Sequence, residues 1–329
     1  MRTSPFKALA LLSGGLDSIL AVKIIQEQNI SVEAVSFQSP FFRNKQIDDV
    51  ALKLGIRLHK IDMTREILAI IQNPVYGFGK NLNPCIDCHL SMIKRSGEFL
   101  KEIHADFLIT GEVLGERPKS QNTNALNLIA KRSGFGDILV RPLSAKKLKI
   151  TRAEEEGFVD REKLLDLAGR SREPQLALAK KYGIDYFPQP AGGCLLTDPC
   201  FCDRLRHSLR LKKMNALDIG LLQVGRHFLT GKGVKIIVGR DDAENRKIRD
   251  LLKDEYYLFE LKDAPGPVTV LCTDEPDEES IIPAASLTAR YSRFRGEKSV
   301  EVVYYRKNEE PRCVTIVPRT HLELNLKLI

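Results

Sequence analysis

The stretch Lys7–Ser18, KALALLSGGLDS, carries the clearest structural signal in the sequence. Its apolar first half indicates a short buried strand, and helical periodicity from Asp17 to Gln28 follows directly. The two glycines between them allow positive φ and let a ligand approach the backbone closely. Serine hydroxyls and the free amides at a helix start both favour an anion. The stretch therefore predicts a phosphate-binding loop between a first strand and a first helix, although it matches neither GxxxxGK[ST] nor GxGxxG.

Strand-like and helix-like segments alternate from this loop over about 140 residues. Such alternation predicts an α/β fold, a parallel sheet with helices on both faces, in which ligands bind beyond the carboxyl ends of the strands. The further strands are expected at 32–38, 57–63, 107–110 and 138–143, and the further helices at 46–54 and 89–104.

The pattern changes after Gly193. A basic helix is expected over 203–214, followed by a smaller α+β unit that ends in a hairpin. We therefore expect three parts: 1–195, a basic connector at 196–215, and 216–329. The strands of the last part are expected at 234–238, 256–261, 268–272, 299–306 and 312–318, and its helices at 244–253 and from the acidic turn at 274–280 to 289.

Composition indicates a folded soluble protein, with 43% hydrophobic and 29% charged residues in a chain of 329. No stretch resembles a membrane helix or a cleavable signal peptide, so we expect a cytoplasmic protein with no membrane partner. The net charge of +8 lies in the first part: residues 1–215 hold 33 basic and 24 acidic side chains, against 18 and 19 in the remainder. This asymmetry favours a polyanionic partner, while a solvated basic face is the simpler alternative.

Three of the seven cysteines stand in unusual contexts. Cys85 and Cys88 lie three residues apart at the start of an expected helix, where the helix N-terminus lowers a thiol pKa, and Cys194 follows two glycines. Two close thiols and a distant one suit an iron–sulfur cluster with one open iron, or zinc with His89 as a fourth ligand. Three structural thiols are the third reading. Cys200 and Cys202 are interpreted as bystanders, and Cys272 and Cys313 as core residues.

The string Ser13-Gly14-Gly15-Leu16-Asp17-Ser18 after an N-terminal strand resembles the PP-loop of the N-type ATP pyrophosphatases. The resemblance implies that the enzyme splits ATP between the α and β phosphates and adenylates its substrate. It implies that Ser13, Gly14, Gly15 and Ser18 hold the pyrophosphate, with Asp17 near the Mg²⁺ and the phosphates.

The PP-loop together with NPCxxC and a later Gly-Cys resembles the tRNA enzymes that make 4-thiouridine and 2-thiouridine. Two further segments, 110–121 and 141–143, are similar to those of 4-thiouridine synthetases, which carry Gly-Gln where this chain has Gly115-Glu116. The similarity covers residues 7–195. The THUMP RNA-binding domain typical of such enzymes has no counterpart here, and segments 225–228 and 238–245 resemble an NFACT-R-type RNA-binding domain instead.

These resemblances imply a tRNA sulfurtransferase that uses ATP, Mg²⁺ and a [4Fe-4S] cluster, with zinc as the alternative metal. The expected partners are tRNA and a sulfur donor, either sulfide or a persulfide carrier such as a cysteine desulfurase, and a homodimer is left open. The alternative functions are a PP-loop ligase or amidotransferase acting on a small molecule, and a non-catalytic RNA- or ribosome-binding protein. The expected catalytic residues are Asp17, Cys85, Cys88 and Cys194, the three cysteines also being the metal ligands; Phe37, Gly111, Lys119 and Gln121 join the PP-loop at ATP; and Lys146, Lys147, Arg172, Arg204, Arg210 and Lys212 contact RNA. Arg226, His227 and Arg240 are further RNA candidates.

Overall fold

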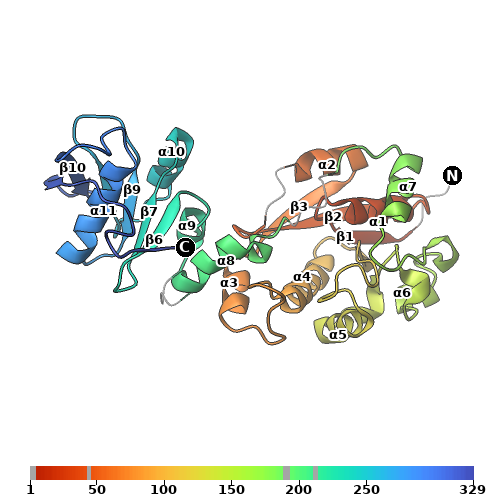
Figure 1. Ribbon diagram of the computed structural model, residues 1–329. Coiled ribbons are helices and arrows are strands. Elements are labelled where there is room, and N and C mark those ends of the chain that lie inside the picture. The colour runs from red at the N-terminus through yellow and green to blue at the C-terminus, as the bar shows by residue number, and fades with distance from the viewer. Residues whose placement is uncertain (1–4, 43–45, 188–192, 210–213) are drawn as a thin grey trace. The chain divides into compact units, whose positions relative to one another are not determined.

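The computed structural model describes residues 5–42, 46–187, 193–209 and 214–329, and the chain divides into two compact units, Met1–Thr197 and Asp198–Ile329 (Figure 1). Each unit has its own sheet and its own buried core.

The sheet of the first unit is entirely parallel and has the order β3-β2-β1-β4-β5. The chain builds outward from β1 on one side and then returns to place β4 on the other, so the strand order reverses beside β1. In open parallel sheets, ligands bind outside the carboxyl ends of the strands at such a reversal. The strands are β1 Lys7–Leu11, β2 Ser31–Gln38, β3 Arg57–Asp62, β4 Phe107–Thr110 and β5 Leu139–Val140.

Helices cover both faces of this sheet because side chains of each strand alternate between two buried clusters. Ala8 and Ala10 pack with α1, α2 and α7, whereas Leu9 packs with α4 and α5 on the opposite face. The helices are α1 Leu16–Gln26, α2 Ile47–Leu54, α3 Thr64–Gln72, α4 Cys85–Leu100, α5 Thr123–Ser133, α6 Arg152–Glu155 and α7 Glu173–Lys181. Single 3-10 turns lie at Gly136–Ile138, Ala145–Lys147, Arg161–Lys163 and Leu195–Thr197.

The parallel α/β fold expected from the sequence is confirmed, with differences at the element ends. The strand expected at 138–143 is reduced to two residues because the buried Arg141 side chain turns toward Glu112, and Pro142 has no amide hydrogen for a ladder. The helix expected at 89–104 begins at Cys85 and ends at Leu100. Helices α3, α5 and α7 were not expected from the sequence, although the Asn122 side chain caps α5 by accepting from the amide of Ala125.

The second unit contains one antiparallel sheet with the order β11-β10-β8-β9-β7-β6-β12. Helix α11 packs on one face and helices α9 and α10 lie against the other (Figure 1). The strands are β6 Arg226–Leu229, β7 Lys235–Val238, β8 Tyr257–Leu261, β9 Thr269–Cys272, β10 Val300–Tyr305, β11 Arg312–Ile316 and β12 Lys327–Leu328, and the helices are α8 Pro199–Ser208, α9 Ala216–Leu221, α10 Asp242–Asp250 and α11 Glu278–Arg290.

The separate α+β unit and its β10–β11 hairpin agree with the sequence-based expectation, but the hairpin does not end the unit, because β12 follows it and pairs with β6. Helix α8 begins at Pro199, four residues before its expected start, because the Asp198 carboxylate caps it by accepting from the amide of Phe201 at 2.6 Å. None of the helices in the described residues is both long enough and apolar enough to cross a lipid bilayer.

Candidate active site

The loop that follows β1 has the geometry of an anion site. Gly14 has a φ of +77°, and Gly15 is the N-cap of α1. The Gly15 amide donates to Ser13 Oγ at 3.3 Å, and Ser18 Oγ donates to the Gly15 carbonyl at 2.8 Å, so both serines lie inside the loop. The loop thereby brings two hydroxyls and the positive end of the α1 dipole to one place.

Gly111, at the end of β4, packs directly against this loop. A Cβ atom at this position would lie 2.4 Å from the Ser18 amide nitrogen and 2.5 Å from the Asp17 carbonyl carbon. These contacts are with backbone that cannot move aside, so only glycine lets β4 approach the start of α1 this closely. Of the ATP residues expected outside the loop, Gly111 is therefore in direct contact with it.

Asp17 is held in a charged surrounding next to the loop. Burial raises the pKa of its carboxyl, and Arg172 and Arg117 act in the opposite direction. The half-buried Arg172 stands at the start of α7 within electrostatic reach of Asp17, whereas the sequence analysis expected it at an RNA surface.

Glu112, which follows Gly111, connects the loop after β1 to α4, the helix that begins with the CxxC motif. Its carboxylate accepts from Arg141 Nε at 2.8 Å and from Thr110 Oγ1 at 3.1 Å, and it lies 2.9 Å from His89 Nδ1. Burial acts to raise its pKa, but Arg141 and His89 outweigh that effect and lower the pKa of Glu112 to about 2. Sequence analysis missed Glu112, and the available signal was an acidic residue directly after a strand-end glycine.

The two thiols of the CxxC motif lie in the first turn of α4, as expected. Asn83 Nδ2 donates to Cys85 Sγ at 3.1 Å. The Asp87 carboxylate lies in the same turn and accepts from the amides of Val75 and Tyr76 at 2.9 and 3.1 Å, which fixes the loop before the helix.

Cys194 comes to the same region through the chain around it. Its backbone forms an antiparallel β-bridge with that of Phe42, and the Leu195 amide donates to the Phe41 carbonyl at 2.8 Å. Burial, followed by the charges of Cys194 and Cys85, raises the pKa of Cys88 well above that of a free thiol. The expectation that the helix N-terminus lowers this pKa is wrong for Cys88, because desolvation outweighs the dipole. The mutual influence of the three sulfurs places them in one neighbourhood.

The donor chemistry of these thiols suits a soft metal or an iron–sulfur cluster. Within residues 5–42, 46–187, 193–209 and 214–329, however, no three Cys, His, Asp or Glu side chains are placed to hold a metal ion. The three described cysteines therefore lie in one neighbourhood, but their sulfur atoms are not arranged as a complete set of metal ligands.

The remaining expected ATP residues have different surroundings. Phe37 lies half-buried near the carboxyl end of β2, among apolar side chains. Lys119 Nζ donates to the Tyr76 carbonyl at 3.1 Å. Gln121 is buried and its Oε1 accepts from the Arg117 amide at 3.1 Å, so this side chain shapes the loop around Arg117.

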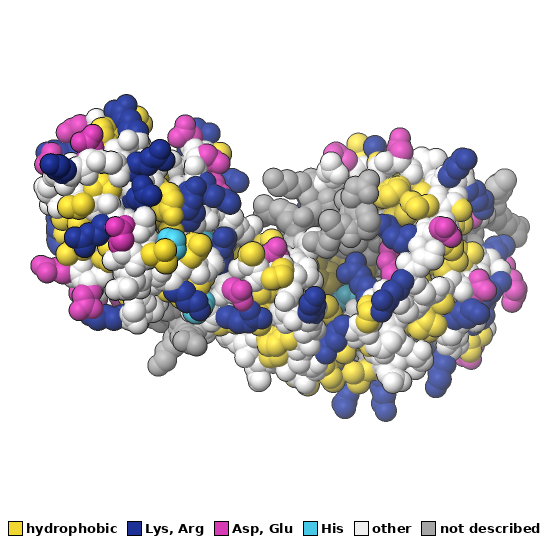
Figure 2. Space-filling model, viewed as in Figure 1, with side chains coloured by type: hydrophobic (Ala, Val, Ile, Leu, Met, Phe, Trp, Pro, Cys, Tyr) yellow, Lys and Arg dark blue, Asp and Glu magenta, His cyan; other side chains and the backbone are white. Residues whose placement is uncertain are grey.

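The residues expected to contact RNA differ in their exposure. Lys146 and Lys147 are exposed, and Lys146 Nζ lies 3.2 Å from Glu162 Oε2. Arg204 is half-buried and donates to the Leu222 carbonyl at 3.0 Å, whereas Arg210 and Lys212 lie outside the described residues. Figure 2 shows Lys and Arg side chains on the visible faces of both units, interspersed with fewer acidic ones.

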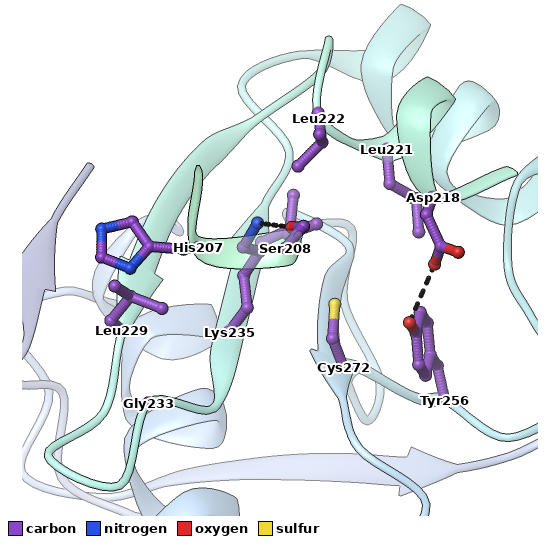
Figure 3. Close-up of a pocket in the computed structure, with 11 residues that line it drawn as sticks. His207, Ser208, Asp218, Leu221, Leu222, Leu229, Gly233, Lys235, Tyr256 and Cys272 are labelled. Atoms are coloured by element: carbon purple, nitrogen blue, oxygen red, sulfur yellow. Dashed lines mark hydrogen bonds between the residues drawn. The ribbon is translucent and has the colours of Figure 1, made fainter. Parts of the chain in front are cut away.

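The second unit contains a small cavity of about 40 Å³ under α8, which offers room on the scale of a single water molecule (Figure 3). The buried Lys235 ammonium donates to Ser208 Oγ and to the Arg204 carbonyl, and Tyr256 Oη donates to Asp218 Oδ1 at 2.9 Å. Burial lowers the pKa of Lys235 to about 8. The two Lys235 contacts hold α8 to the sheet, so Lys235 has a structural role.

His227 is fully buried on β6, so it cannot contact RNA as the sequence analysis considered. Its Nε2 lies 2.8 Å from the Val224 carbonyl, and no described residue pairs with its Nδ1. Burial, reinforced by Arg204 and Lys235, lowers the pKa of His227 to about 3.

This pKa predicts acid sensitivity of the second unit. The unfolded chain binds a proton near the ordinary pKa of 6.5 while the folded chain does not, so stability falls as the pH drops from about 6.5 toward 3. Between pH 7 and pH 5 we expect this group alone to cost about 2 kcal/mol of unfolding free energy. Urea unfolding of the full chain, followed by circular dichroism, measures it. His227→Gln should remove this part of the pH dependence, and an unchanged dependence would contradict the assignment.

Comparison with known proteins finds two family models. Residues 4–156 match "Thiamine biosynthesis protein (ThiI)", and residues 225–326 match "NFACT protein RNA binding domain". The first unit is thus similar to the ThiI family model over its first part, and the second unit is similar to the NFACT RNA-binding model over most of its length.

The ThiI-family match contains the PP-loop, Gly111, Glu112 and both CxxC thiols, and ends before Arg172 and Cys194. The NFACT match covers the antiparallel sheet from β6 to the last loop before β12. Helix α8 lies between the two matches.

Solved structures with similar segments have low overall scores. The C-terminal part of the fibronectin/fibrinogen-binding protein from Streptococcus suis is 13% identical, with a TM-score of 0.28 over 78% of this chain and 94% of that one. A 4-thiouridine synthetase–RNA complex with bound ATP is 21% identical, with a TM-score of 0.36 over 54% of this chain and 52% of that one. The U34-tRNA thiolase NcsA from Methanococcus maripaludis, with its [4Fe-4S] cluster, is 17% identical, with a TM-score of 0.32 over 58% of this chain and 61% of that one. The chain thus spans less than two thirds of the two thiolation enzymes, and TM-scores this low do not assign a function.

Proposed function

We propose that the protein is an ATP-dependent tRNA sulfurtransferase that converts a uridine into a thiouridine. One observation carries the proposal: Glu112 extends from the glycine that touches the PP-loop and meets His89, the neighbour of Cys88. The phosphate loop and the cysteine helix therefore lie at the same carboxyl edge of the parallel sheet, where phosphate chemistry and sulfur chemistry can act on one substrate.

The chemistry needs both halves because a uracil carbonyl oxygen is a poor leaving group. The oxygen attacks the α-phosphorus of ATP, pyrophosphate departs, and the oxygen becomes part of an AMP leaving group. A sulfur nucleophile then forms the C–S bond as the C–O bond to AMP breaks. Ser13, Gly14, Gly15 and Ser18 would hold the departing phosphates, since the loop places two hydroxyls and the N-terminus of α1 there.

Cys85, Cys88 and Cys194 would hold a [4Fe-4S] cluster, which supplies an open iron for sulfide when it is bound. The soft thiol donors and the convergence of the three sulfurs support this assignment, and zinc is the alternative outcome. His89, held through Nδ1 by Glu112, keeps α4 oriented toward β4.

The NFACT RNA-binding domain supports tRNA as the substrate, together with the excess of basic residues in the first part of the chain. Sulfide or a protein persulfide would supply the sulfur, and a tRNA substrate would place the reaction in the cytoplasm.

Nucleoside mass spectrometry tests the proposal. The full-length protein, with or without anaerobic iron and sulfide reconstitution, is incubated with tRNA, ATP, Mg²⁺ and sulfide. We expect a thiouridine that requires ATP and reconstitution, and about four irons per chain by metal analysis. AMP without any thiouridine would favour a small-molecule ligase, and RNA binding without ATP cleavage would favour a non-catalytic protein. Stoichiometric zinc with thiouridine would replace the cluster and keep the reaction.

A further inference from the structure

Unpaired buried polar atoms gather beside the PP-loop. Among the described residues, no hydrogen-bond partner is present for Asp17 Oδ1, Glu116 Oε2, Arg172 Nε and both amide atoms of Gln175. Gln175 is 1% exposed, and its amide approaches the Asp17 carboxylate without a hydrogen bond of normal geometry, which is costly for the folded protein alone. Orphan atoms of this kind are expected where a ligand completes the hydrogen bonding.

These side chains come from two segments that the backbone holds together. Leu114 forms a parallel bridge with Ala168, and the Gly169 amide donates to the Leu114 carbonyl at 2.7 Å. The chain then enters α7, whose start carries Arg172 and Gln175. Glu116 lies two residues beyond Leu114, so the two segments face the PP-loop together.

The three charged groups act on each other. Burial raises the pKa of the Asp17 carboxyl, and the Arg172 charge and the nearby Gln175 amide oppose that rise. Burial raises the pKa of Glu116, and the Asp17 charge raises it further. Two carboxylates that are close enough for this effect repel each other unless a proton or a cation lies between them.

A closed ion-pair network would be the ordinary explanation for such a cluster, and the geometry does not support it. Within the described part of the chain, Asp17, Glu116 and Arg172 make no ion pair within 4.0 Å. By contrast, the nearby Glu112–Arg141 pair is closed at 2.8 Å. The buried Glu112–Arg141 pair is in direct contact, whereas Asp17, Glu116 and Arg172 are not paired with one another. The cluster beside the PP-loop is therefore distinct from a structural salt bridge.

The chemistry of the open atoms is that of a metal–phosphate ligand. Mg²⁺ in nucleotide sites is held by one or two carboxylates together with phosphate oxygens, and keeps several waters. A guanidinium donates charge-assisted hydrogen bonds to phosphate, and an amide both donates to phosphate and accepts from metal-bound water. The PP-loop supplies the adjoining phosphate position.

We propose that Glu116 joins Asp17 in binding the Mg²⁺ of the nucleotide, and that Arg172 and Gln175 bind its phosphates. This inference rests on the proposed function in that the PP-loop binds ATP. It makes Arg172 a nucleotide residue and removes it from the RNA surface. It also gives Glu116 a role at the position where 4-thiouridine synthetases carry glutamine.

Isothermal titration calorimetry of the full-length protein with α,β-methylene-ATP tests the assignment, because binding is measured without turnover. We expect Arg172→Gln to weaken binding about tenfold or more. Glu116→Gln should weaken binding only when Mg²⁺ is present, so that affinity rises less with Mg²⁺ concentration than it does in the wild type, because Asp17 remains as a ligand. Arg170→Gln is the matched control, since this arginine is exposed on the same segment and should leave the affinity for the analogue unchanged.

Filter binding of tRNA without nucleotide separates the two roles of Arg172. We expect Arg172→Gln to bind tRNA like the wild type. A variant that binds the analogue normally but loses tRNA affinity would overturn the assignment of Arg172, and a Glu116→Gln variant with wild-type Mg²⁺ dependence would overturn that of Glu116.

Two further comparisons keep the result interpretable. Arg172→Lys preserves the charge, so it should fold even if the glutamine variant does not and should retain more affinity than Arg172→Gln. A wild-type protein that binds Mg²⁺ and the analogue but makes no thiouridine would refute the proposed function and leave this inference standing. A wild-type protein that does not bind the analogue would refute both.

Discussion

Replacing Cys194 by serine is expected to lower thiouridine formation by about 100-fold or more, because a hydroxyl neither ligates a soft metal nor carries sulfur. Cys194 is half-buried, its backbone forms a β-bridge with Phe42, and its charge acts on Cys88 of α4. Serine is nearly isosteric, so the fold should be retained. The measurement is thiouridine yield by nucleoside mass spectrometry under anaerobic conditions.

Cys313→Ser provides the matched control. This thiol lies exposed on β11 of the second unit, and not in the core as expected from the sequence, so its replacement should leave the thiouridine yield unchanged. Iron analysis of both variants adds a second readout, since Cys194→Ser should lose bound iron while Cys313→Ser keeps it. Full product formation by Cys194→Ser would remove this cysteine from the reaction and from the ligand set.

Replacing Glu112 by glutamine is expected to destabilise the first unit by about 3 to 5 kcal/mol, because it leaves the buried Arg141 guanidinium without a counter-charge. The same substitution weakens the contact with His89 and so releases α4 from β4. Urea unfolding measures the loss. The double variant Glu112→Gln/Arg141→Gln should recover part of the stability, since no buried charge then lacks a partner.

The pH dependence of stability gives an independent check on Glu112. Its folded pKa of about 2 lies below the ordinary value of 4.5, so it stabilises the folded state fully above pH 4.5. That contribution is lost as the pH falls from 4.5 toward 2. The glutamine variant should lack this part of the acid transition, and a Glu112→Gln variant as stable as the wild type at pH 7 would refute the pairing.

Local signals sufficed wherever a structure depends on neighbours in the sequence. The SGGLDS string between an apolar run and a helical pattern led to the loop, and the CxxC spacing led to two thiols on one helical turn. Glycines were informative because their conformational role is local, as the φ of +77° at Gly14 shows.

Expectations failed where burial and distant partners decide. His227 was an RNA candidate because a basic side chain in a turn-like context suggests a surface, but the fold buries it inside the second unit. The position of Arg172 within electrostatic reach of Asp17 was likewise not visible in the sequence. The thiol pKa of Cys88 likewise depends on desolvation by elements far away in sequence, which outweighs the local helix dipole.

The sequence by itself determined the parallel α/β unit, the glycine-rich loop between its first strand and first helix, the two thiols on one helical turn and the presence of a second α+β unit, because periodicity and motif spacing are local properties of the chain. Only the tertiary structure decided that Glu112 links His89 to Arg141, and that Glu116, Arg172 and Gln175 gather around Asp17. These groups are separated by up to 158 positions in the sequence and meet only because the strand order reverses beside β1. Whether a polar side chain is buried, and which charge it then faces, is a property of that packing.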